Sequence, residues 1–237
     1  GVQTCALPIL FINDLEDGLA DIDLVSKFAD DTKVAQIIRS DEDVQKLQTA
    51  LDALARWAQT WQMEFNVLKC KVMHVGRSNR RHVYNMMGQE LQITEEEKDL
   101  GVVITNNLKP SKQCARAAAT ACTVLGQISR SFHYRDRKNF VQLYKTYVRP
   151  HLEYAAQAWS PWSRGDIETL EKVQQRAVNM ISGLKEASYT CKLKEIGLVS
   201  LEERRHQADM CSVYRILTGK DDVDPATWFD MAADSGR

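Results

Sequence analysis

The stretch that decides the fold is Lys27–Val34, which reads KFADDTKV and contains two adjacent carboxylates, Asp30 and Asp31. Apolar runs flank it at residues 22–25 and 34–38, and their β-branched residues favour strands. Because Asp tolerates turn conformations, we expect a β-hairpin whose tight turn is Asp30-Asp31. Side chains alternate across a strand, so such a tip cannot bury both carboxylates. The pair is either a solvated turn or an oxygen-rich point that suits a hard cation such as Mg²⁺.

Composition excludes several classes of protein. The 237 residues suffice for one large or two small domains. The sequence contains no run of 18 apolar residues, so we expect no membrane span. The six cysteines form no Cys-x-x-Cys pair and the five histidines are scattered, which argues against a zinc site. We see no targeting signal and expect an intracellular protein with reduced thiols. Residues 1–9 are similar to a translated sequencing adapter, so we exclude them from the fold and expect a truncated piece of a longer protein.

Charge is distributed unevenly along the chain. Residues 1–64 contain 5 basic and 12 acidic side chains, residues 65–150 contain 15 and 6, and residues 151–237 contain 11 and 14. An acidic tip beside a basic middle is typical of a protein that handles phosphates with a metal ion. A solvated basic face without a partner is the alternative.

The hydrophobic pattern predicts an α+β fold. Ser40 begins a helix of about five turns that reaches Trp61, and strands follow at 65–75 and 100–104 with a hairpin at 83–93. Residues 10–105 therefore form a small antiparallel sheet with one long helix, and residues 106–220 are helical. We expect helices to end near Pro150 and Gly183 and the last to span Leu201–Leu217, before a polar tail at 221–237.

Several motifs together resemble the reverse transcriptases of non-LTR retrotransposons of the LINE type, jockey- and CR1-like. In chain order they are Phe28–Lys33, Trp57 with Trp61, Asn66-x-x-Lys69, Lys98–Val102, Leu143-Tyr144, Val148–Tyr154 and Leu170–Ala177. The resemblance extends over nearly the whole chain from Leu10. It implies that residues 10–105 are part of a polymerase palm and that residues 106–220 are a thumb-like region.

The resemblance also implies roles for individual residues. Asp30 and Asp31 would be ligands of two Mg²⁺ ions (Mn²⁺ is possible), which activate the primer hydroxyl and stabilise the transferred phosphoryl group. Lys69 would neutralise the pyrophosphate leaving group; a charge at a strand edge is the alternative. The residues expected to contact primer or nucleic acid are Phe28, Ala29, Leu100, Gly101, Lys109, Lys112 and Arg116. A second candidate for phosphate contact is the basic cluster of Arg130, Arg135, Arg137 and Lys138. The implied partners are an RNA template, a DNA primer duplex and deoxynucleotide triphosphates, and no membrane.

The family pattern is incomplete in this sequence. A further metal-binding aspartate and the fingers would lie upstream of Leu10, and two carboxylates alone are too few ligands for two ions. We therefore expect that the intact parent polymerises DNA and that this chain alone does not. The alternatives are a non-catalytic nucleic-acid-binding module and, more remotely, a phosphoacceptor acidic pair, whose fold would need alternating parallel strands and helices.

Overall fold

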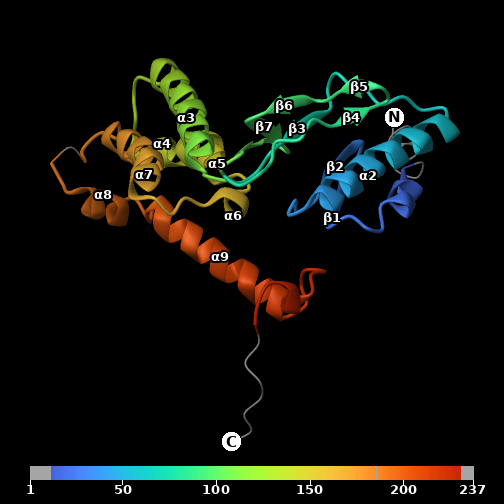
Figure 1. Ribbon diagram of the computed structural model, residues 1–237. Helices are drawn as coiled ribbons and strands as arrows, with labels where there is room; N and C mark the ends of the chain where they lie inside the picture. Colours follow the sequence, from blue (N-terminus) through green and yellow to red (C-terminus); the bar gives the residue numbers. More distant parts are fainter. Residues whose placement is uncertain (1–11, 185, 231–237) are drawn as a thin grey trace, which may run out of the picture. The chain divides into compact units, whose positions relative to one another are not determined.

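The computed structural model describes residues 12–184 and 186–230, which form two compact units (Figure 1). Unit 1 comprises residues up to 97 together with 105–108, and unit 2 comprises 98–104 together with 109 onward. Small sheets and one long helix make up unit 1, and helices dominate unit 2, so the α+β class is confirmed. The adapter-like residues 1–9 lie outside the described residues.

The hairpin of unit 1 exists, but its turn is one residue earlier than expected. Strands β1 (Leu24–Phe28) and β2 (Asp31–Ala35) pair antiparallel, and the turn is Ala29-Asp30, with Ala29 at φ 52°. This register places Val25 opposite Val34 on the half-buried face. A turn at Asp30-Asp31 would have placed Val25 opposite a polar residue, so apolar matching outweighs the turn preference of the second Asp.

The long helix begins where its cap predicts. In α2 (Asp41–Thr60) the Ser40 side chain accepts from the Asp43 amide, and the Asp43 carboxylate accepts from the Ser40 amide at 2.8 Å, which closes a capping box. Trp57 lies near the C-terminal end, and its indole nitrogen donates to Asp14 at 2.9 Å in the 3₁₀ helix η1 (Asn13–Gly18). The core of unit 1 gathers apolar residues of η1, α2 and the later strands, chiefly Leu15, Leu19, Val44, Ala50, Leu54, Tyr84, Met86 and Leu91.

The remaining strands are shorter than expected and do not form one antiparallel sheet. They are β3 (Lys71–Met73), β4 (Asn85–Met86), β5 (Gln89–Glu90), β6 (Gln92–Thr94), β7 (Glu96–Asp99) and β8 (Val102–Thr105). Within the described residues the strands form four two-stranded sheets, and β3 and β6 pair parallel. The hairpin predicted over 83–93 exists as β4–β5 with its turn at Gly88, but it is shorter than expected, because Gln92–Thr94 pairs with β3 instead. Gln48 of α2 holds this hairpin by two hydrogen bonds to Asn85, of 2.8 and 3.0 Å.

Unit 2 is a helical bundle around one apolar core. Its helices are α3 (Ser111–Ser131), α4 (Arg137–Leu143), the π-helical η2 (Tyr144–Val148), α5 (Arg149–Glu153), α6 (Ala156–Trp159), α7 (Arg164–Asn179), α8 (Tyr189–Glu195), α9 (Leu201–Leu217) and the 3₁₀ turn η3 (Pro225–Thr227). Helix α3 packs on α5 and α7, and the bounds predicted for the last helix, Leu201–Leu217, are confirmed.

The expected end near Pro150 is wrong, because the helical path continues to Glu153. Pro150 lacks an amide hydrogen, and the wider π turn of η2 just before it accommodates that missing hydrogen bond.

Candidate functional site

The two carboxylates lie at an exposed tip that the rest of the hairpin holds in place. Asp30 is in the turn, Asp31 opens β2, and both are exposed, as expected. Phe28 is paired with Asp31 and is 62% exposed, so a large apolar ring stands beside the acid. Lys27 faces the other way: its ammonium donates to the carbonyls of Ile12 (3.2 Å) and Asn13 (3.0 Å). This anchor fixes β1 on η1 and leaves the tip exposed.

The tip by itself does not have enough ligands for a metal site. In the described ranges no group of three or more His, Cys, Asp or Glu residues could hold a metal ion. Mg²⁺ prefers octahedral oxygen ligands, and a two-ion centre needs carboxylates on more than one side. Asp30 and Asp31 therefore fit one part of such a centre and do not form a complete one.

Lys69 lies in a turn and not on a strand. The amide of Lys69 donates to the Asn66 carbonyl at 2.9 Å, and that of Cys70 donates to the same carbonyl at 3.3 Å. The strand expected over residues 65–75 is therefore wrong from 65 to 70. There the Asn66 carbonyl accepts hydrogen bonds from nearby amides of the same turn and not from a neighbouring strand. The strand-edge interpretation of Lys69 fails with it, and the side chain is exposed.

The Leu100-Gly101 turn joins β7 to β8 and is held by a tyrosine. Leu100 and Gly101 have positive φ angles of 44° and 90°. The hydroxyl of Tyr154 donates to the Leu100 carbonyl at 2.9 Å, and a Cβ added at Gly101 would lie 3.1 Å from a ring carbon of Tyr154. Glycine suits this position because its φ is positive and because the Tyr154 ring approaches closely. Two motifs that are far apart in the sequence, Lys98–Val102 and Val148–Tyr154, thus contact each other inside unit 2.

The basic residues assigned to phosphate contact lie at the start of α3. Lys109, Lys112 and Arg116 are all exposed, and the first turn of α3 contains no acidic residue. Gln113 is 5% exposed and accepts from the Val103 amide at 2.9 Å, which ties β8 to α3. The N-terminal end of a helix attracts anions, so basic side chains there strengthen an existing preference.

Sequence reasoning missed a buried polar network that organises unit 2. Gln174, fully buried in α7, accepts from the Tyr144 hydroxyl at 2.8 Å and donates to Tyr189 at 3.0 Å and the Val199 carbonyl at 2.9 Å. Burial first, and then the neighbouring acids, raise the pKa values of both tyrosines, so these hydroxyls stay protonated and donate. The resemblance to the Leu170–Ala177 motif includes Gln174, but a pattern of residues cannot reveal what a buried amide pairs with.

A second set of charged residues supports the Val148–Tyr154 motif. Glu153 pairs with Arg204 of α9 and, at 3.5 Å, with Arg149 of its own helix. Arg205, next in α9, is 5% exposed, and the terminal nitrogens of its guanidinium are buried without a hydrogen-bond partner. Burial lowers the pKa of Arg205, and the carboxylate of Glu171 partly offsets that shift. These groups fix α9 against the motif.

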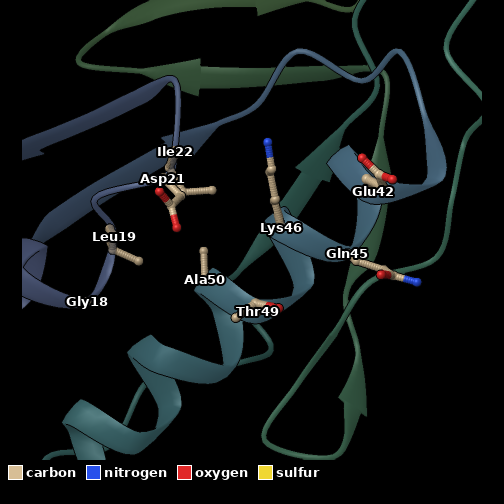
Figure 2. A pocket seen from close by; sticks show the side chains of 9 residues that line it. All are labelled: Gly18, Leu19, Asp21, Ile22, Glu42, Gln45, Lys46, Thr49 and Ala50. Carbon is tan, nitrogen blue, oxygen red and sulfur yellow. The ribbon is translucent and has the colours of Figure 1, made fainter.

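An open pocket of about 340 Å³ in unit 1 does not coincide with the acidic tip (Figure 2). The end of η1 and the residues after it form one side, and residues of α2 form the other: Gly18, Leu19, Asp21, Ile22, Glu42, Gln45, Lys46, Thr49 and Ala50. Asp21 and Lys46 contribute opposite charges from the two sides, and Leu19, Ile22 and Ala50 are apolar. The pocket contains none of the residues that the sequence singled out.

Comparison with known proteins supports the resemblance at low identity. No family model matches the chain, and no solved structure matches it. The RNA-directed DNA polymerase from mobile element jockey of Drosophila melanogaster is 24% identical over 165 residues, and that of Drosophila funebris is 27% identical over 168 residues. Each alignment covers 68% of this chain and 18% of the relative. The chain is distantly similar to the jockey polymerases.

The chain thus spans about 18% of the length of the jockey relatives that it matches. An uncharacterized protein of Caenorhabditis elegans is 24% identical over 134 residues, which are 55% of this chain and 68% of that protein.

Among the helices that the structure describes, none has the length and the apolar character that a membrane span requires.

Proposed function

We propose that this chain is the C-terminal part of the palm and the thumb of an RNA-directed DNA polymerase of a non-LTR retrotransposon. The observation that supports this most is the set of ordered motifs in a chain of which 68% is similar to jockey polymerase. The relatives are far longer than this chain, so activity is proposed for the longer protein.

In this proposal unit 1 supplies one side of the catalytic centre. Asp30, exposed at the turn, is the main metal ligand, and Asp31 lies beside it on the open face. Bound Mg²⁺ would activate the primer hydroxyl and neutralise charge on the transferred phosphoryl group. The small side chain of Ala29 leaves room for a primer end, and the exposed ammonium of Lys69 neutralises the leaving group. In this proposal the longer polymerase supplies the remaining oxygen ligands.

Unit 2 holds the template–primer duplex by its phosphates. The exposed side chains of Lys109, Lys112 and Arg116 provide positive charge at the start of α3. The Leu100-Gly101 turn approaches the primer strand, and Tyr154 fixes its shape by the hydrogen bond to the Leu100 carbonyl.

Primer extension tests this proposal. The reading frame extended upstream of Leu10 is expressed and given an RNA template, a DNA primer, deoxynucleotide triphosphates and Mg²⁺ or Mn²⁺. Extension is expected, and Asp30→Asn should reduce it by at least about a hundredfold, because the ion loses an anionic ligand. Asp17→Asn, which changes another exposed acid of unit 1, is the matched control. An inert upstream-extended protein, or equal activity of the two variants, would refute the assignment.

A second candidate is a nucleic-acid-binding module without catalysis. It is favoured by the incomplete set of acids in the described residues together with the 15 basic and 6 acidic side chains of residues 65–150. The chain should then bind an RNA–DNA duplex with little sequence preference, and binding should weaken steeply with salt. Arg116→Ala should lower the slope of log K against log salt by about one if Arg116 contacts one phosphate. Absence of duplex binding at low salt would contradict this candidate.

A further inference from the structure

The loop between α3 and α4 (Figure 1) contains three ring-bearing residues in a row, and all three are exposed. Phe132 is 46% exposed, Tyr134 is 81% exposed, and His133 between them is exposed as well. Proteins usually bury most of such ring surface, because each large aromatic side chain loses more than a kilocalorie of transfer free energy when it stays in water. Three exposed rings in succession therefore indicate a surface that contacts something else.

Hydrogen bonds of Arg135 and Asp136 hold this loop in place. The Arg135 guanidinium donates to the Ser129 carbonyl and hydroxyl, both at 2.9 Å, and to the Phe132 carbonyl at 3.2 Å. The Arg135 carbonyl accepts from the Ser182 amide at 3.2 Å, and Asp136 caps α4 by accepting from the Asn139 amide at 3.1 Å. Arg135 therefore has a structural role, unlike the phosphate contact expected for it. The rings are presented without the entropy cost of ordering a mobile loop on binding.

Positive charge surrounds the rings. Residues 130–138 contain four basic side chains and one acidic one, and the acid, Asp136, is occupied as a helix cap. Arg135 is bonded to α3 and Arg137 pairs with Glu195 of α8, which leaves Arg130 and Lys138 exposed on either side of the rings. A polyanion with exposed flat groups is complementary to this surface in both charge and shape. Two copies of the same cationic loop would repel each other, so self-association is disfavoured.

We propose that the Phe132–Tyr134 loop is a binding site for single-stranded nucleic acid. Unpaired bases stack on Phe132 and Tyr134, while Arg130 and Lys138 contact the flanking phosphates. A duplex keeps its bases stacked on one another inside the helix, so the rings select unpaired nucleotides over duplex. The proposed site uses none of the residues assigned to the metal ions and none of Lys109, Lys112 and Arg116, and it requires no catalysis by the chain.

The test measures affinity of the full chain for a fluorescein-labelled 12-mer of uridine, a 12-mer of thymidine and a blunt 12-base-pair duplex, by anisotropy at low salt. Tyr134→Ala should weaken binding of the single strands by roughly 5- to 150-fold, the range for loss of one stacked base, and change duplex binding less than about twofold. Tyr134→Phe keeps the ring and should keep the affinity. Tyr214→Ala removes a tyrosine of α9 that is 56% exposed and should change neither.

Four results would overturn the proposal. The unaltered chain could fail to bind either single strand at low salt. Tyr134→Ala could behave like Tyr214→Ala, or it could weaken single strands and duplex equally. Sedimentation could also show that the chain self-associates and that Tyr134→Ala abolishes this, which would make the loop a protein interface. Circular dichroism of each variant checks that the fold is retained, and Phe132→Ala provides a second ring if Tyr134→Ala fails to fold. The two proposals can fail separately. If the longer protein does not extend a primer, or the chain does not bind duplex, while the chain still binds single strands, the polymerase assignment is refuted and the single-strand site is not.

Discussion

Substitution of Gly101 by Ala tests the contact between the two motifs of unit 2. Gly101 has a φ of 90°, which costs a residue with a Cβ about 1 kcal/mol or more. The new Cβ would lie 3.1 Å from the Tyr154 ring, so the ring must shift and strain the 2.9 Å hydrogen bond to the Leu100 carbonyl. Tyr154 is 57% exposed and can move, which keeps this second cost near 1 kcal/mol. The total is about 2 kcal/mol of unfolding free energy.

Gly183→Ala is the matched control, because Gly183 has a φ of 84° and nothing within 4 Å of an added Cβ. It should show the backbone cost alone, about 1 kcal/mol. Urea unfolding followed by circular dichroism at 222 nm reports on the helices, most of which lie in unit 2, and gives both values. In a Tyr154→Ala background the excess at Gly101 should disappear, as a coupling energy of about 1 kcal/mol. Equal costs at the two glycines, or an excess that persists without Tyr154, would refute the reasoning.

Three other predictions concern buried groups. Gln174→Leu should destabilise unit 2 by about 2–4 kcal/mol in urea unfolding, because it leaves the Tyr144 hydroxyl and the Val199 carbonyl buried without their partner; the exposed Gln207→Leu should cost under about 0.5 kcal/mol. Burial, followed by the charge of Arg81, lowers the pKa of His74, and its hydrogen bonds with Asn79 and His82 only partly offset this, so unit 1 should keep its full stability above about pH 6.5 and lose it as the pH falls. Urea midpoints of His74→Phe should show a flatter pH dependence below about 6.5, whereas a change of the exposed His206 to Gln should not. Burial, and then the charge of Asp166, raises the pKa of Cys114 to about 12. A thiol reagent at neutral pH should therefore modify the exposed Cys191 and Cys211 in the native chain, and Cys114 only after unfolding. Fast labelling of Cys114 in the native chain would contradict its 0% exposure.

Local signals in the sequence predicted the elements that depend on local physics. The Ser40 cap predicted the start of α2, and the apolar spacing predicted the bounds of α9. The short strands were harder to predict, because a two- or three-residue pair such as β4–β5 is stabilised by a side chain from elsewhere, here Gln48 of α2. The parallel pairing of β3 with β6 joins residues about twenty positions apart and leaves no periodic trace in either strand.

The candidate site was less predictable, because a motif identifies residues without showing which of them the fold itself uses. Tyr154 and Glu153 belong to one motif, and both have partners far away in the sequence, Leu100 and Arg204. Arg135 was expected to contact phosphate, yet its guanidinium holds the end of α3. Charge alone could not separate that structural arginine from an exposed one, since both read as basic residues in a basic segment.

The same distinction bears on the acidic tip. Residues that a fold needs have partners within it, as Lys27 has with the carbonyls of Ile12 and Asn13. Asp30 and Asp31 are exposed at the turn, where repulsion between two adjacent carboxylates opposes the hairpin to a small extent. If the tip serves only as a turn, Asp30→Asn should leave unit 1 as stable or slightly more stable, and it should change no activity of the longer polymerase. If it binds metal ions, the same substitution should keep the stability and abolish extension, so stability and activity measured on one variant separate the two interpretations.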